Sequence, residues 1–116
     1  MKVLFESASP DGAPLRELAE TRTRFAMRRL TWLVPRARIS LSDVNGPRGG
    51  VDKRCRIELR THRAGDVQVT ALARDWRTAL ESALARAARV LVRQWRRSRS
   101  RDRVRLRALG HQHQGS

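Results

Sequence analysis

Residues 43–55, with the sequence DVNGPRGGVDKRC, decide the fold of this chain. The segment is rich in turn formers and charges, and it continues into an alternation of apolar and charged residues over 54–60. A similar alternation over 37–42 precedes it. A period of two is typical of strands with one buried face, so we expect two strands joined by the loop 44–53. That loop is longer than a hairpin requires, which favours a functional or specially shaped connection.

The rest of the chain adds two strands and two helices around this pair. We expect a first strand at 2–6, a helix from about 14 to 33 that Pro35 ends, a fourth strand at 67–71 and a second helix that Asp75 caps. The link at 62–66 contains a glycine and suits a hairpin. The resulting order is β-α-β-β-β-α.

This order predicts an α+β fold in which both helices pack on the single apolar face of a four-stranded sheet. The first two strands should be parallel neighbours. Residues 1–97 should form one domain, because 116 residues leave little core for two. After at most a turn or two of further helix, we expect 98–116 to be a basic, disordered tail, since it has few apolar residues.

The charge of the chain indicates a polyanionic partner. Its 26 Lys and Arg against 11 Asp and Glu leave a net charge of +15, and residues 76–116 alone contain 11 basic and 2 acidic groups. Nucleic acid is the first candidate, because crowded like charges repel unless a partner neutralises them. A single cysteine, with no signal peptide and no long apolar run, predicts a cytoplasmic protein without a membrane partner.

The second helix carries the strongest candidate site. Its basic residues fall within an arc of about 100° on the side away from the apolar stripe, and no carboxylate occurs between Glu81 and Asp102. Solubilising helix faces normally mix both signs of charge, so an RNA-phosphate contact is favoured over a plain solvated face. The residues of this ridge are Arg86, Arg89, Arg93, Arg96 and Arg97.

Further candidate RNA contacts lie on the first helix and in the long loop: Arg22, Arg24, Arg28, Arg29, Arg48 and Lys53. On the first helix a salt-bridged surface is an equally good interpretation, because acidic residues accompany the arginines. Leu18, Phe25 and Trp32 recur every seven residues, and they either flank the sheet, meet the second helix or form a partner-binding seam.

The sequence shows no catalytic constellation, and we expect neither an enzyme nor a small-molecule substrate. Cys55 belongs to the apolar face of its strand and is expected to be a buried structural thiol. The histidines are too few and too scattered for a metal site, so we expect no metal and no cofactor.

The pattern Asp43-x-Asn45-Gly46-Pro47, continued by Gly50-x-Asp52-Lys53-x-Cys55, resembles the signature segment of the ribosome hibernation promoting factors, also called ribosome-associated translation inhibitors. Asp75 followed by Ala79-Leu80-Glu81 is similar to the opening of that family's second helix. The resemblance is to the short form, since 19 residues after Arg97 cannot build a second domain.

The resemblance implies a domain similar to double-stranded-RNA-binding domains that binds the small ribosomal subunit and its rRNA. It would inhibit translation by occluding the channel of messenger and transfer RNA. The family's rRNA contacts would fall on Arg22, Arg86, Arg89 and Arg93. Two alternatives stay open: a general binder of structured or double-stranded RNA, and a protein-interaction regulator that uses the Leu18–Phe25–Trp32 seam.

Overall fold

The computed structural model describes residues 1–44 and 51–114. The elements follow the predicted order β-α-β-β-β-α, with a short 3-10 helix before the first α-helix. The elements of secondary structure are β1 (Lys2–Ser7), η1 (Ala13–Leu15), α1 (Arg16–Ala26), β2 (Arg36–Asp43), β3 (Lys53–Arg60), β4 (Val67–Ala73) and α2 (Trp76–Gln114).

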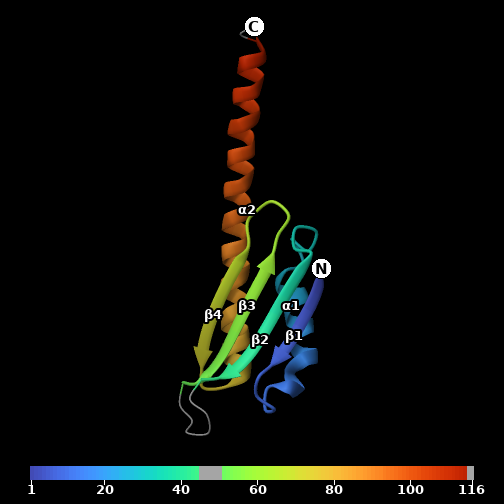
Figure 1. The fold of residues 1–116 in the computed structure, drawn as a ribbon, viewed down its shortest axis with the longest axis vertical. Helices are drawn as coiled ribbons and strands as arrows, with labels where there is room; N and C mark the ends of the chain where they lie inside the picture. The colour runs from blue at the N-terminus through green and yellow to red at the C-terminus, as the bar shows by residue number, and fades with distance from the viewer. Residues whose placement is uncertain (45–50, 115–116) are drawn as a thin grey trace.

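The four strands form one sheet in the order β1-β2-β3-β4. β1 pairs with β2 in parallel, and the other two pairings are antiparallel. Ile39, Ile57 and Val69 stand in register across the middle of the sheet, so the apolar positions of the strands share one face. Both helices cover this face and leave the other open (Figure 1). The α+β class and the parallel neighbours β1 and β2 are thus as predicted.

The first helix is shorter than its apolar pattern predicts. α1 ends at Ala26, and residues 27–34 continue as turns in which Leu30 donates to the carbonyl of Met27 and Leu33 donates to that of Leu30. Such i→i+3 turns keep a spacing of about three residues between apolar side chains. Met27, Leu30 and Leu33 therefore remain buried even though the α-helix has ended.

Two local devices fix the chain around β4 as the sequence predicts. Gly65 has a φ of 79°, which a glycine adopts without strain, and it lies in the link between β3 and β4. Asp75 caps α2, because its carboxylate accepts hydrogen bonds from the backbone N–H and the hydroxyl of Thr78, both at 2.8 Å. These hydrogen bonds lower the pKa of Asp75 below its ordinary value, and the bond from the backbone N–H of Thr78 has the larger effect.

The second helix extends far beyond the sheet (Figure 1). Burial ends at Ser98, whose hydroxyl donates to the carbonyl of Arg63 at 2.9 Å, one residue after the predicted domain boundary. We expected a disordered tail after at most two further turns, whereas α2 continues to Gln114 with residues 99–109 exposed. Adding a residue to an existing helix needs no new nucleation, and Arg, Leu and Ala favour helix, so the helix can outlast its packing. No helix among 1–44 and 51–114 is long and apolar enough to cross a membrane.

Cys55 should be inert in the folded protein. Its side chain is fully buried in β3, and this burial raises its pKa to about 12. Because the thiolate is the nucleophile, alkylation by iodoacetamide at pH 8 should be slower in the native protein than in guanidinium by a factor on the order of 1000. The folded state favours the protonated thiol, whereas the unfolded chain loses this proton above about pH 9. The free energy of unfolding should therefore also decrease as the pH rises from about 9 towards 12. Equal alkylation rates, measured by mass spectrometry, would contradict the burial.

Candidate nucleic-acid interface

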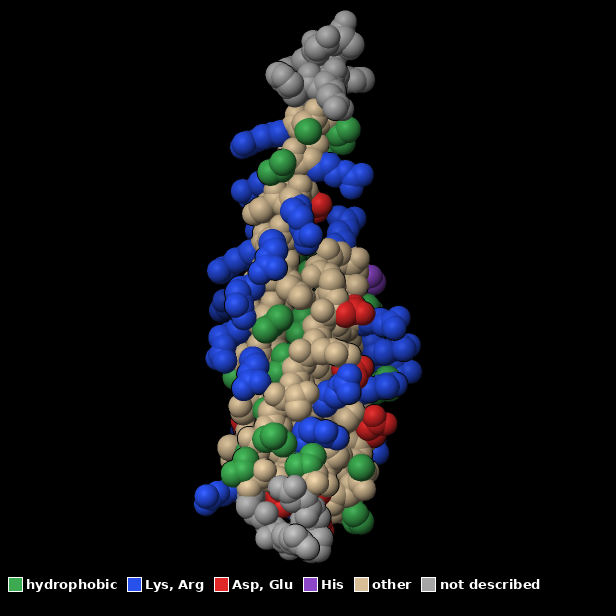
Figure 2. Space-filling view, turned by 60° about the vertical axis from the view of Figure 1, so that its left-hand side comes forward, with side chains coloured by type: hydrophobic (Ala, Val, Ile, Leu, Met, Phe, Trp, Pro, Cys, Tyr) green, Lys and Arg blue, Asp and Glu red, His purple; other side chains and the backbone are tan. Residues whose placement is uncertain are grey.

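The predicted ridge borders a groove on the outer surface of the helices. On the α2 side it is lined by Ala88 and Val92 together with Arg89, Arg93 and Arg96. These three arginines are exposed, and no hydrogen bond or ion pair within the described ranges holds their side chains. Figure 2 shows a row of basic side chains along the left margin of the molecule, over the helix layer. Free guanidiniums on a rigid helix are suited to bidentate phosphate contacts.

Arg86 and Arg97 complete the predicted ridge but differ in their surroundings. Arg86 donates a hydrogen bond of 2.9 Å to the carbonyl of Thr70, so its guanidinium leans towards β4. Arg97 is exposed on the same helix. The structure thus places all five predicted side chains on the surface of α2, with Arg86 bound to the backbone of the sheet.

The other side of the groove is built by the turn that follows α1. Arg28 and Arg29 line a hollow of about 300 Å³ that shares Ala88 and Val92 with the ridge. Arg28 also lies over the ring of Phe25, 4.3 Å from its centroid, and donates to the carbonyl of that residue at 2.9 Å. The chain therefore brings together arginines that are about 60 residues apart in sequence on two sides of one shallow groove.

The two predicted arginines that lie within α1, Arg22 and Arg24, already have partners within the protein. Arg22 pairs with Glu81 of α2 at 3.2 Å, and both side chains are nearly half exposed, at 44% and 45%. An ion pair so exposed contributes little to the stability of the fold, and another anion can readily replace Glu81 as the partner of Arg22. Arg24 donates to the carbonyl of Met1 at 3.0 Å. RNA contacts by Arg22 and Arg24 remain predictions that require these interactions to be replaced.

The ammonium of Lys53 is held by contacts within the protein. Its ammonium lies 2.6 Å from the carboxylate of Asp43 and 3.5 Å from that of the fully buried Asp52, and it stands over the ring of Trp76 at 5.3 Å. The hydrogen bond to Asp43 raises the pKa of Lys53. Lys53 thus links the two aspartates at the base of the loop. Arg48 and the predicted contacts of the loop over 45–50 lie outside the described residues.

The Leu18–Phe25–Trp32 seam divides into two parts. Trp32 meets α2, as one of the interpretations predicted, and its ring forms an edge-to-face contact with Trp95 at 6.0 Å. Phe25 and Trp32 are nevertheless about 60% exposed, whereas Leu18 packs against the core. The seam is therefore not one continuous apolar strip, which weakens its use as a protein-binding surface.

Sequence reasoning missed one basic surface. Arg36, Arg38, Arg54, Arg56 and Arg60 occupy outward positions of β2 and β3, on the open face of the sheet, and all five are exposed. The signal was present, since the arginines alternate with the buried residues of both strands. Among the described residues, no group of three or more His, Cys, Asp or Glu side chains could hold a metal ion.

Comparisons with known proteins establish the class of fold. No family model and no curated protein sequence matches the chain. Among solved structures, it is similar to a ribosomal subunit interface protein from Coxiella burnetii, with a TM-score of 0.60 and 15% identity over 80% of this chain and 96% of that one. It is also similar to the N-terminal domain of Protein Y from Thermus thermophilus, with a TM-score of 0.57 and 19% identity over 79% of this chain and 93% of that one. The chain thus has the α+β fold of these two domains.

Proposed function

We propose that this chain is a non-enzymatic, cytoplasmic ribosome-binding factor that contacts rRNA of the small subunit and inhibits translation. The observation that carries the proposal is the groove between α2 and the turn that follows α1, with Arg28 and Arg29 of the turn on one side and Arg89, Arg93 and Arg96 of α2 on the other. It occurs on a fold shared with a ribosomal subunit interface protein. The signature resemblance of residues 43–55 supports the same family.

The physical basis of binding in this proposal is neutralisation of phosphates. The groove has guanidiniums without a partner in the described part of the chain, from Arg89, Arg93 and Arg96 on the α2 side and from Arg29 on the other, so a phosphodiester backbone can be neutralised from both sides. A general binder of structured RNA would use the same chemistry, because a basic α/β surface can recognise A-form shape without sequence. The two differ in whether ribosomes compete better than other RNA.

Sedimentation separates these possibilities. The protein should pellet with isolated small subunits through a sucrose cushion, and an equal mass of free duplex RNA should displace at most a small part of it. Large subunits provide the matched control for ribosomal RNA in general. If the protein distributes according to RNA mass, it is a general structured-RNA binder. If it binds neither RNA, the protein-interaction alternative replaces the proposal.

A further inference from the structure

The open face of the sheet is a second strongly basic surface, on the side opposite to the helices. Six cations project from it: Lys2, Arg36, Arg38, Arg54, Arg56 and Arg60. The described strands contribute only two carboxylates to this face, from Glu6 and Glu58. Figure 2 shows basic side chains along both margins of the domain, those of the helix layer on the left and those of the sheet on the right.

The register of the strands places like charges directly opposite one another. Lys2 pairs with Arg36, which in turn pairs with Arg60, so one row across three strands contains three cations and no acid. Like charges opposite each other destabilise a sheet. A repulsive row that does not serve folding is therefore best explained by a ligand that neutralises it.

Most of these cations are free to bind. Glu58 pairs with Arg56 at 3.1 Å, and Arg54 donates to the hydroxyl of Ser42 at 2.9 Å. No hydrogen bond or ion pair within the described ranges holds the side chains of Lys2, Arg36, Arg38 and Arg60. The face therefore presents four cations that need no internal contact to be broken.

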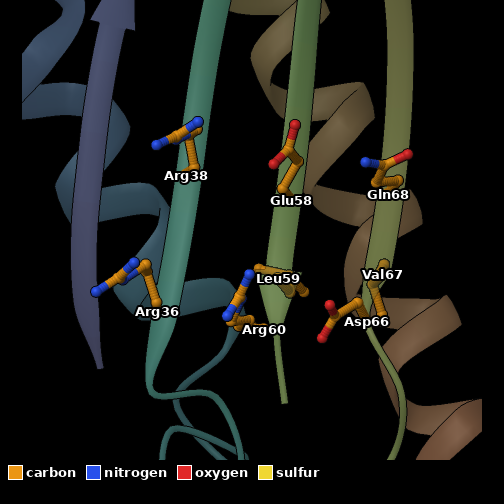
Figure 3. Close-up of a pocket in the computed structure, with 8 residues that line it drawn as sticks. All are labelled: Arg36, Arg38, Glu58, Leu59, Arg60, Asp66, Val67 and Gln68. Atoms are coloured by element: carbon orange, nitrogen blue, oxygen red, sulfur yellow. The ribbon is translucent and has the colours of Figure 1, made fainter.

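The three free arginines line one side of a shallow hollow, and acidic and amide side chains from β3, the β3–β4 link and β4 line the other (Figure 3). It encloses about 240 Å³, and its lining includes Arg36, Arg38 and Arg60 together with Glu58, Asp66 and Gln68. Pockets for drug-sized ligands usually enclose roughly 300–1,000 Å³, so this hollow suits a phosphate group of a longer chain better than a separate small molecule. Guanidiniums bind such a group bidentately.

The rest of the face argues against a protein partner. Protein interfaces depend on large apolar or aromatic anchors, and Leu72 is the one large apolar side chain that the described strands expose by more than half. The ridge on α2 and this face point in opposite directions, with the core between them. One RNA segment on the ridge therefore leaves the sheet free for another.

We propose that the open sheet face is a second binding surface for RNA backbone, so that the domain can be held between two RNA segments. This inference does not depend on which RNA the ridge binds. The cations around the hollow, Arg36, Arg38 and Arg60, lie outside the signature segment 43–55. A domain that bound RNA through the α2 groove alone would not have the stoichiometry that this second surface predicts.

Native mass spectrometry of the full chain with an excess of a duplex of about 16 base pairs tests the stoichiometry. The wild type should form complexes with two duplexes. The variant R36Q/R38Q/R60Q should bind only one, and its melting temperature should not decrease because the substitutions remove repulsion. The matched control Glu58→Gln releases Arg56 and should strengthen the second binding step by about 2–5-fold. A wild type that binds one duplex, or a triple variant that still binds two, overturns the proposal.

Phenylglyoxal labelling tests the same surface without any substitution. Excess RNA should protect Arg36, Arg38 and Arg60 from modification in the wild-type protein, as read by peptide mass spectrometry. Parallel samples with duplex and with single-stranded RNA show which form of backbone the face accepts. If neither RNA protects these arginines while an acidic polypeptide does, the face is a protein-binding surface and the proposal is wrong.

Discussion

Reversal of Arg89, Arg93 and Arg96 to glutamate should abolish association with ribosomes while the domain stays folded. The three side chains form one side of the α1–α2 groove and have no partner within the described part of the chain, so their loss breaks no internal contact. Each exposed substitution should change the free energy of unfolding by about 0.5 kcal/mol or less. Binding should weaken by at least about 100-fold, and the slope of log K against log salt should decrease in magnitude by about 2–3.

The matched control carries the same change of charge on the projecting part of α2. Reversal of Arg101, Arg103 and Arg105, which are exposed beyond the last buried residue, should weaken binding without abolishing it. Sedimentation measures both variants, and circular dichroism checks their folding. If the control variant loses association and the groove variant keeps it, the projecting helix is the RNA-binding element and the groove is not.

The sheet was predictable from the sequence because its strands carry local information. The alternation over 37–42 and 54–60 identifies both the strands and their buried faces, and one residue of slippage would expose every apolar side chain. The C-terminal ends of α1 and α2 were less predictable. Turns over 27–34 preserve the spacing of a helix, and the extension of α2 depends on helix elongation, which a count of packing residues does not detect.

The candidate site was predictable only in part for a related reason. Helical spacing and the absence of acids identified the α2 ridge, because both are properties of one segment. The partners of Arg22 and Lys53 come from other elements, so sequence spacing could not reveal that Glu81 and Asp43 occupy them. The open sheet face was visible as alternating arginines, but its row of opposed cations emerges only from the pairing of β1, β2 and β3.

Prior loading of the small subunit with messenger and initiator transfer RNA should lower its affinity for this protein by at least about tenfold. The expectation follows from the occlusion of the messenger and transfer-RNA channel that the resemblance of residues 43–55 implies. Mutual exclusion is reciprocal, so ligands that the protein displaces must weaken the protein's own binding by the same factor. The chain extends over 69 × 23 × 17 Å along its principal axes, so a domain lodged in that channel would exclude an RNA ligand sterically.

Two measurements check this expectation. Fluorescence titration of vacant and of fully loaded small subunits gives the two affinities, and addition of the protein to a translation extract before or after initiation gives the functional counterpart. Inhibition should be strong in the first order of addition and much weaker in the second. The groove variant R89E/R93E/R96E should inhibit in neither order, which excludes a nonspecific effect of the protein preparation. Equal affinity for vacant and loaded subunits would place the binding site away from the channel. Only a protein that binds outside the channel has the same affinity whether or not messenger and transfer RNA are bound.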